Sequence, residues 1–326
     1  MRLTDAVHLG LMLLALGIAY MVPVELLLLS YVVLGPAHYT TEISWLHDRK
    51  YFLPHGGVAV VLAVVAAAAA MIDSASWLGL VMWSAFVVCA LFAATTTGAQ
   101  GVVLVIGGLG LTGLMYVREP SLAVLGVLLP TLIHVSLFTL IFMTLGACRS
   151  GSRVQAALVV VYVLAIGLIL AFPPTAAVLI PAFAEVARDY FGNVAPALGR
   201  VLGIPGLSLD GRFTGLLAFV YTYHYLNWFI KADVIRWADV PPARLALVAV
   251  ISAASTGLYF YDYALGFSVL LALSLVHVVL EFPLNALAMR QLGDVAWQAL
   301  RPVGWPPDTS SRRLPERRRR RRSHQR

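Results

Sequence analysis

The sequence predicts an all-α integral membrane protein: a polytopic transmembrane helical bundle of about ten spans, with both termini in the cytoplasm. Of the 326 residues, 60% are hydrophobic and 12% are charged, whereas soluble globular proteins carry about 25% charged residues. The apolar stretches are long and continuous, and they do not alternate as the strands of a membrane barrel would. Basic residues gather in alternate loops between these stretches, which predicts an orientation in the membrane.

Each predicted span is an apolar run of roughly the length that crosses the hydrocarbon core, which takes about 20 helical residues. The first run has no small-residue cleavage site after it, so we expect it to be retained as a helix. Pro23, Pro120 and the Pro173-Pro174 pair mark boundaries between runs. The predicted spans are residues 6–21, 24–46, 55–72, 76–96, 100–117, 121–147, 154–172, 212–231, 244–262 and 265–289.

The charges between the spans set the predicted orientation. With an even number of spans both termini share one side, and the loops on the other side carry few charges of mixed sign. Lysine and arginine are enriched in cytoplasmic loops, so the more basic side is predicted to be cytoplasmic. The basic residues on that side are Arg2, Arg49, Lys50, Arg149, Arg153, Lys231, Arg236, Arg244 and the C-terminal arginines.

We expect one membrane domain, residues 1–290, followed by a basic and disordered cytoplasmic tail, residues 291–326. The tail contains the arginine run 317–322 and dominates the formal net charge of +7. Such a run is typical of a solvated segment near anionic lipid head groups. Aromatic side chains are not interleaved with the arginines, so no nucleic-acid partner is predicted. The sequence does not indicate an oligomeric state.

Four histidines lie at a similar depth in four of the predicted spans. His38, His134, His224 and His277 each follow the start of their span by about 12 to 14 residues, and the four spans run in the same direction. At about 1.5 Å per residue, the four side chains fall within one helical turn of the same depth. Ionisable groups are costly in a bilayer and face the bundle interior with partners. The four imidazoles therefore predict a metal site inside the bundle.

Carboxylate and amide side chains accompany three of these histidines. Glu42 follows His38 by four residues, and Glu281 follows His277 by four, which places each pair on one helix face. Asn227 follows His224 by three. A ligating imidazole usually donates its second N–H to a carboxylate or carbonyl, so the two glutamates suit either an orienting or a ligating role. Imidazole and carboxylate donors together favour iron, zinc or manganese over calcium or magnesium.

Two further features surround the predicted site. Pro36, two residues before His38, removes a backbone N–H and is expected to kink or break its helix. Aromatic residues are dense around His224, which predicts an aromatic-lined apolar cavity for a long hydrophobic substrate. These aromatic residues are Phe219, Tyr221, Tyr223, Tyr225, Trp228 and Phe229.

Other functions could use the same four histidines. Two histidine pairs could each clamp a haem, as in a membrane electron-transfer protein. The His/Glu pairs could also form the proton relay of a proton-coupled transporter, or serve only as interhelical contacts. The remaining histidines lie at span ends, in a loop or in the tail and are given no site role. They are His8, His47, His55 and His324.

Around these histidines the chain resembles a known family, the bacterial Brp/Blh-like β-carotene-cleaving dioxygenases. Four short motifs in the same order carry the resemblance. Gly35-Pro36-Ala37-His38 with Glu42 is similar to the first, Ile133-His134 to the second, Tyr223-His224 to the third, and Val276-His277 with Glu281 to the fourth. This chain has Tyr39 where the family has a glycine, Glu42 where it has an aspartate, and Trp228 where the third motif has a second histidine.

The resemblance implies a membrane-bound, iron-dependent oxygenase in the bacterial inner membrane. His38, His134, His224 and His277 would hold the metal, while Glu42, Glu281 and Asn227 would support catalysis. The partners would be the lipid bilayer, O₂ and a hydrophobic small-molecule substrate, a carotenoid or another polyene or lipid-like chain. The reaction expected from the family is the oxidative cleavage of a carotenoid.

Overall fold

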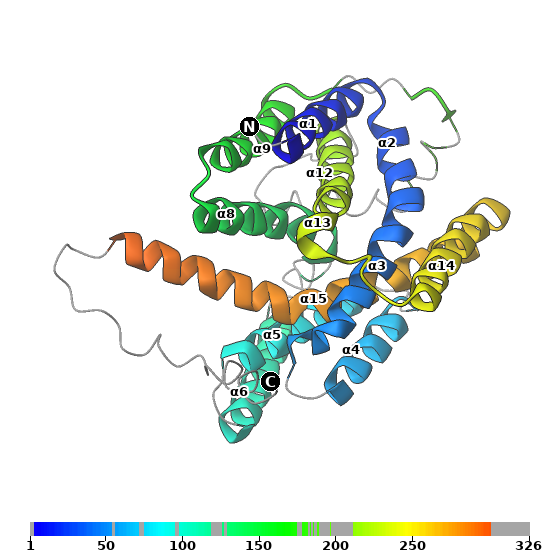
Figure 1. Cartoon of the computed structure of the whole chain (residues 1–326). Coiled ribbons are helices and arrows are strands. Elements are labelled where there is room, and N and C mark those ends of the chain that lie inside the picture. The colour runs from blue at the N-terminus through cyan, green and yellow to red at the C-terminus, as the bar shows by residue number, and fades with distance from the viewer. Residues whose placement is uncertain are drawn as a thin grey trace, which may run out of the picture.

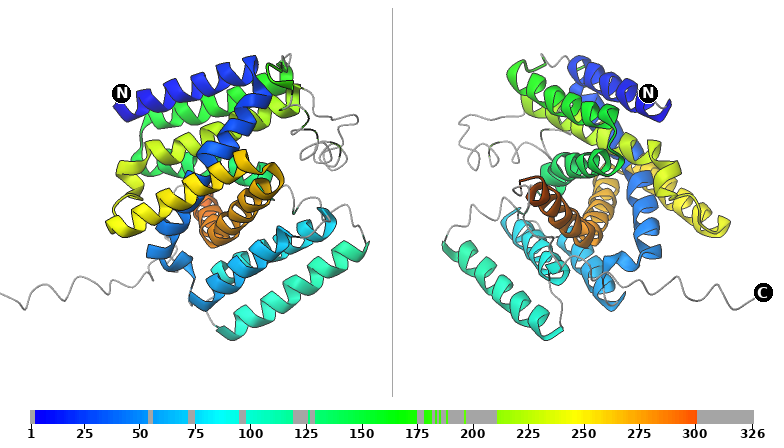
Figure 2. Two further views of the ribbon diagram at one scale, coloured as in Figure 1. Left: turned by 90° about the vertical axis from the view of Figure 1, so that its right-hand side faces the viewer. Right: turned by 60° about the vertical axis from the view of Figure 1, so that its left-hand side comes forward.

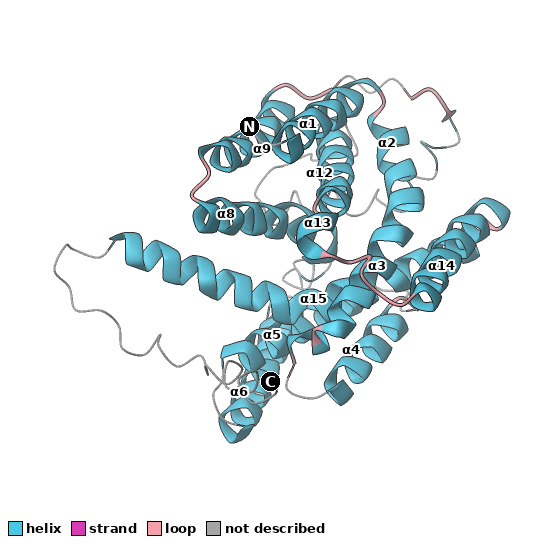
Figure 3. Cartoon of the chain, in the orientation of Figure 1, coloured by secondary structure: helices cyan, strands magenta, loops and turns pink. Residues whose placement is uncertain are grey.

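The structure of the chain is a computed structural model that describes residues 3–53, 56–71, 75–94, 98–118, 129–174 and 211–300, with isolated positions between these ranges. The described residues form helices and short connections, with no strand among them (Figure 3). The predicted all-α class is therefore confirmed. The C-terminal residues 301–326, which contain the arginine run, lie outside the described residues.

Each predicted span overlaps helical structure among the described residues (Figure 1), although the first part of the sixth span, residues 121–125 and 127–128, lies outside them. The second predicted span corresponds to α2, a π-helical turn and α3, and the sixth to a π-helix followed by α8. The elements are α1 (Leu3–Met21), α2 (Pro23–Leu29), η1 (Ser30–Leu34), α3 (Gly35–Asp48), η2 (Lys50–Phe52), α4 (Gly56–Ala69), α5 (Ala75–Ala94), α6 (Gly98–Arg118), η4 (Leu129–Phe138), α8 (Thr139–Ser150), α9 (Arg153–Ala171), α12 (Gly211–Ile230), α13 (Ala232–Ile235), α14 (Pro242–Tyr261) and α15 (Tyr263–Leu300).

The chain has the helices of an integral membrane protein. Within the described residues, five helices are long and apolar enough to cross a membrane: Thr4–Met21, Leu132–Ser150, Arg153–Ala171, Pro242–Tyr261 and Tyr263–Ala299. Shorter apolar helices cover Gly56–Ala69, Trp77–Leu91 and Val105–Arg118. The count of about ten crossings and the cytoplasmic placement of both termini stay predictions.

Helix α9 shows the two environments that a membrane bundle provides. Leu158, Tyr162 and Ala165 are buried on one side, whereas Val160 and Leu164 are 55% and 64% exposed on the other. Large apolar side chains exposed in a row would be costly in water but are suited to lipid. The helix begins at Ser152, whose side chain accepts a hydrogen bond from the Gln155 N–H, directly after the left-handed Gly151 that ends α8.

The core consists of two main hydrophobic clusters, each built around one central helix. In the first, α12 packs against α1, α2, η1 and α9. In the second, α15 packs against α4 and α5. Figure 2 shows α15 running across the bundle, with α4, α5 and α6 on one side of it and α1, α9 and α12 on the other. The helix continues to Leu300, ten residues beyond the predicted end of the membrane domain at 290.

The second span bends where Pro36 was expected to disturb it. Pro36 has no N–H to donate, and the preceding residues Ser30–Leu34 form a π-helical turn. The carbonyl four residues before Pro36, that of Val32, accepts a hydrogen bond of 2.9 Å from the Thr256 hydroxyl of α14. The Pro36 carbonyl accepts another, of 3.3 Å, from Ser252. The Thr256 hydroxyl of a neighbouring helix thus takes the place of the N–H that Pro36 lacks, as the apolar surroundings require.

Position 35 has no room for a side chain, because the Tyr39 side chain, one helical turn later, lies against Gly35. A Cβ atom built on Gly35 would lie 2.9 Å from the Tyr39 hydroxyl oxygen. This hydroxyl is held by a hydrogen bond of 2.6 Å to the Tyr225 hydroxyl, so it cannot move freely.

We predict that Gly35→Ala lowers the thermal stability of the detergent-purified protein, because Tyr39 must be displaced, at a cost of about 1–3 kcal/mol. Gly17→Ala in α1 is the control, because nothing lies within 4 Å of its added Cβ. The control should be neutral or stabilising by up to about 1 kcal/mol. Thermal unfolding followed by tryptophan fluorescence measures both variants. Equal behaviour of the two would show that Tyr39 is not confined by Gly35.

Candidate metal centre

The structure brings the four predicted histidines together from four elements. His38 comes from α3, His134 from η4, His224 from α12 and His277 from α15. His38, His134 and His277 are at most 2% exposed, and His224 is half-buried because it borders a cavity. The four histidines, which helix rise predicts to lie at the same depth, therefore also lie close together in space.

The four imidazole rings surround one point. Their centroids are 4.7 Å apart for His38 and His224, 4.9 Å for His224 and His134, 5.1 Å for His134 and His277, and 5.4 Å for His277 and His38. Neighbouring rings are nearly perpendicular, with interplanar angles of 69–79°. The Nε2 atoms of His38 and His224 are 3.1 Å apart, and those of His134 and His277 are 3.3 Å apart.

These distances fit nitrogens that share a metal ion. Two nitrogens bound at about 2.1 Å, with an angle of about 90–110° between the bonds, lie about 3.0–3.4 Å apart. Two groups of side chains could hold an ion: His38, His134 and His224, and His38, Glu42 and His277, all of them buried or bordering the cavity. Without a cation, the facing Nε2 atoms could share only one proton within each pair, which leaves buried nitrogens poorly satisfied.

The two glutamates have different positions relative to the rings. The Glu42 Oε2 atom lies 3.1 Å from the His38 Nε2, on the side where the nitrogens converge. The Glu281 Oε2 atom lies 3.0 Å from the Nδ1 of His134, on the far side of that ring. Glu42 is therefore placed where it could ligate an ion, whereas Glu281 lies within ion-pair distance of one ring and outside the set of converging nitrogens.

The partner of Glu281 differs from the one that its spacing suggested. His277 and Glu281 are one turn apart on α15, but the carboxylate reaches His134 of another helix. The carboxyl groups of Glu42 and Glu281 are both buried beside histidines of the cluster. Buried carboxylates need compensating positive charge, which a bound dication would supply.

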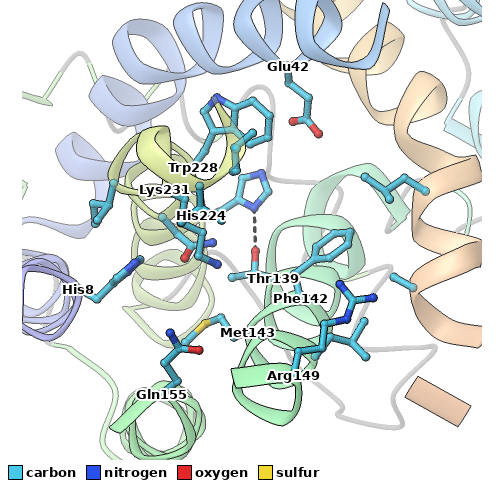
Figure 4. A pocket seen from close by; sticks show the side chains of 18 of the residues that line it. His8, Glu42, Thr139, Phe142, Met143, Arg149, Gln155, His224, Trp228 and Lys231 are labelled. Atoms are coloured by element: carbon cyan, nitrogen blue, oxygen red, sulfur yellow. Dashed lines mark hydrogen bonds between the residues drawn. The ribbon is translucent and has the colours of Figure 1, made fainter. Parts of the chain in front are cut away.

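Side chains outside the predicted set fix the ring orientations. The Thr139 hydroxyl lies 2.7 Å from the Nδ1 of His224 (Figure 4), so it can accept the Nδ1–H and leave the Nε2 lone pair facing the centre. The Tyr39 ring stacks on His277 with centroids 4.3 Å apart. Thr139 lies five residues after His134, and its role gave no sequence signal because a threonine in an apolar helix usually bonds its own backbone.

Trp228 lies against the site at the place where the resembled family has a second histidine. Its ring meets the His38 ring edge-on at 5.5 Å, and its indole N–H donates a 3.0 Å hydrogen bond to the Thr41 hydroxyl. Asn227 borders the adjoining cavity together with His224, and its Oδ1 atom has no hydrogen-bond partner among the described residues.

A cavity of about 870 Å³ connects the cluster with one end of the bundle. His38, His224, Glu42 and Glu281 border it at one end. Figure 4 shows Met143, Gln155 and Arg149 further from Glu42 than His224 and Thr139 are. The prediction of an aromatic lining holds only in part. Of the six aromatic residues around His224 that the sequence singled out, Tyr223 and Trp228 border the cavity. Phe219, Tyr221 and Tyr225 are buried in the packing of α12, and Phe229 packs partly buried against the same cluster.

Comparisons of the chain with models of known protein families, with curated proteins and with solved structures gave no match.

We predict that Thr139→Val lowers the affinity of the protein for Fe²⁺ by about 10- to 100-fold, because the His224 ring loses the acceptor that orients it. The control is Thr144→Val, whose hydroxyl bonds the Leu140 carbonyl of its own helix. Competition with a calibrated Fe²⁺ chelator measures both affinities under anaerobic conditions. Equal affinities in the two variants would contradict an orienting role for Thr139.

Proposed function

We propose that the protein is an integral-membrane oxygenase of the bacterial inner membrane that uses non-haem iron to oxidise a hydrophobic polyene or lipid-like substrate. Carotenoid cleavage is one reaction of this class. The observation that carries the proposal is the convergence of four imidazole nitrogens and the Glu42 carboxylate in an apolar interior. The cavity that borders this cluster gives a substrate a route to it.

The donor set favours iron over zinc. Structural zinc closes its coordination at four ligands, and catalytic zinc keeps three from the protein. Four imidazoles and one carboxylate make five donors, which suit an ion that takes six ligands and leave one position for a small molecule. Manganese shares this preference, so metal content has to be measured directly. When bound, iron would supply the binding and activation of O₂.

The residues of the chain have separate tasks around that ion. His38, His134, His224, His277 and Glu42 would hold it, since neutral imidazoles and a carboxylate are the forms that bind a metal. Thr139 orients His224, and Glu281 lies behind His134. Tyr39 stacks on His277 and closes the site on that side. The cavity remains as the approach for an apolar chain.

The family resemblance supports the same assignment. The four histidines that carry its motifs are those that converge in the structure. Trp228 takes the place of the family's second histidine in the third motif and packs on His38 instead of ligating. The Glu42 oxygen, on the inner side of the cluster, supplies a fifth donor.

The haem alternative has less support. A haem clamped between two imidazoles needs room for a flat macrocycle between their Nε2 atoms. The Nε2 atoms of His38 and His224 are 3.1 Å apart, and the other two rings of the cluster close the space beside them.

Protein purified in detergent is expected to contain about one iron per chain and to lack a Soret band. Alanine at His38, His134, His224 or His277 should lower the iron content more than about tenfold, because each removal takes away a ligand. His47→Ala is the control, since this exposed histidine contacts Tyr51 outside the cluster. Mass spectrometry of the metal and an absorption spectrum are recorded on the same sample. A Soret band, or full iron content in all four variants, would refute the proposal.

Iron-loaded protein is expected to consume O₂ and bleach the absorption of a polyene such as β-carotene in lipid nanodiscs. Glu42→Gln should reduce both rates, because a neutral amide is a weaker ligand than a carboxylate. Gln155→Glu, at the distant end of the cavity, tests whether any change of charge has the same effect. Iron binding without O₂ consumption on polyenes or acyl lipids would separate a metal site from an oxygenase.

A further inference from the structure

The cavity has a different chemical character at its two ends. Next to the metal centre it is bordered by His38, His224 and the two glutamates. Its middle is apolar, with Phe142, Met143 and Leu158 among the lining side chains. Three cationic side chains, Arg49, Arg149 and Lys231, also border it. A purely hydrocarbon substrate has no group that could pair with these cationic side chains.

Residues of α12 and α8 line the cavity between the metal centre and the cationic side chains. His224 and Asn227 lie on α12, and Lys231 directly follows its last residue; their spacing by three and four residues places them along one face. On α8, Thr139, Met143 and Arg149 also border the cavity, with Thr139 at His224. Seven residues of helix separate Lys231 from His224, a rise of about 10 Å. Figure 4 shows the Lys231 and Arg149 side chains in the same pocket as His224.

Positive charge near the cytoplasmic ends of spans is common in membrane proteins and needs no ligand. In this chain, however, the basic residues of that side fall into two groups. Lys50, Arg153, Arg236 and Arg244 do not border the cavity, and Arg236 and Arg244 are paired with Asp239 and Asp48. Arg49, Arg149 and Lys231 do border it.

None of these three cations has a carboxylate partner at ion-pair distance among the described residues. Arg49 lies over the Trp45 ring at 3.8 Å, and Arg149 donates to the Gln291 side-chain oxygen. Asp5 is the acidic side chain in this part of the lining, and it has an interaction of its own. The positive charges therefore outnumber the negative one, which favours an anion there.

We propose that the cavity binds a long-chain lipid with one anionic head group, the head at Lys231 and Arg149 and the apolar chain extending past Phe142 and Met143 to the histidine cluster. This inference rests on the proposed function, since it names the substrate class of that site. A carboxylate and a phosphate monoester are the two head groups with this charge. Arginine pairs with either through two parallel N–H···O bonds, and lysine as a point charge.

The test uses three ligands with the same chain: oleate, oleyl phosphate and oleyl alcohol. Binding of radiolabelled ligand is measured on the full-length protein in nanodiscs of neutral lipid, with empty nanodiscs subtracted. Metal content is measured on the same samples. At least one of the two anions is expected to bind about tenfold or more tightly than the alcohol, because a charge-assisted hydrogen bond contributes about 1.5–3 kcal/mol.

Lys231→Met and Arg149→Met should each weaken binding of the anion by about 10- to 100-fold and leave binding of the alcohol unchanged. Arg153→Met is the matched control, since Arg153 is a basic residue of the same side that does not border the cavity. Tighter binding of oleate identifies a carboxylate head, and tighter binding of oleyl phosphate a phosphate head.

Equal binding of the alcohol and both anions would overturn this proposal, as would an Arg153→Met effect as large as that of Lys231→Met. Neither result bears on the proposed metal centre, because ligand binding is measured without turnover. Conversely, if the histidine variants keep their iron while anion binding still depends on Lys231, the oxygenase assignment fails and the anion site remains.

Discussion

The structure depends on one constraint: polar groups inside an apolar helical bundle must find partners within the protein. Four imidazoles and two carboxyl groups meet in an interior that offers them little else. His224 lies on α12 of one cluster and His277 on α15 of the other, while α3, which carries His38, contributes residues to both. A cation bound at the shared centre would therefore join the two halves of the core as well as satisfy the buried donors, and its binding free energy would add to the stability of the fold.

The backbone is irregular where it serves this centre. The π-helical turn before Pro36 and the π-helix around His134 both interrupt α-helical geometry next to a ligating position. Each additional residue in a turn rotates the following side chains around the helix axis, so it changes which residues face the bundle interior. In lipid such a departure is tolerated only where the freed carbonyls are satisfied. Thr256 does this for the Val32 carbonyl, and Ser252 donates to the Pro36 carbonyl, so α14 is bonded to the backbone just before His38.

The sequence predicted the helices and the meeting of the histidines because both follow from one-dimensional regularities. Apolar run length gives the position of a helix, and helix rise gives the depth of a side chain along it. Contacts between helices do not follow from either. The spacings of His38-Glu42 and His277-Glu281 are identical, yet Glu42 contacts the histidine of its own turn and Glu281 contacts His134 of another helix. Thr139 and Tyr39 were not recognised for the same reason, since their partners His224 and His277 are distant in the chain.

The position of Glu281 also bears on a feature of the sequence, the lack of a carboxylate in the segment of His134. The segment of His134 has no carboxylate of its own, whereas His38, His224 and His277 each have a carboxylate or amide side chain three or four residues later. Glu281, which shares α15 with His277, lies 3.0 Å from the Nδ1 of His134 instead. Glu42 lies on the side of the converging nitrogens and borders the cavity. Arrangement in space, not spacing along the chain, thus gives the glutamates of two similar His-x-x-x-Glu segments different positions. In the proposed site Glu42 would ligate the ion together with its own His38, whereas Glu281 would lie beside a histidine of another helix.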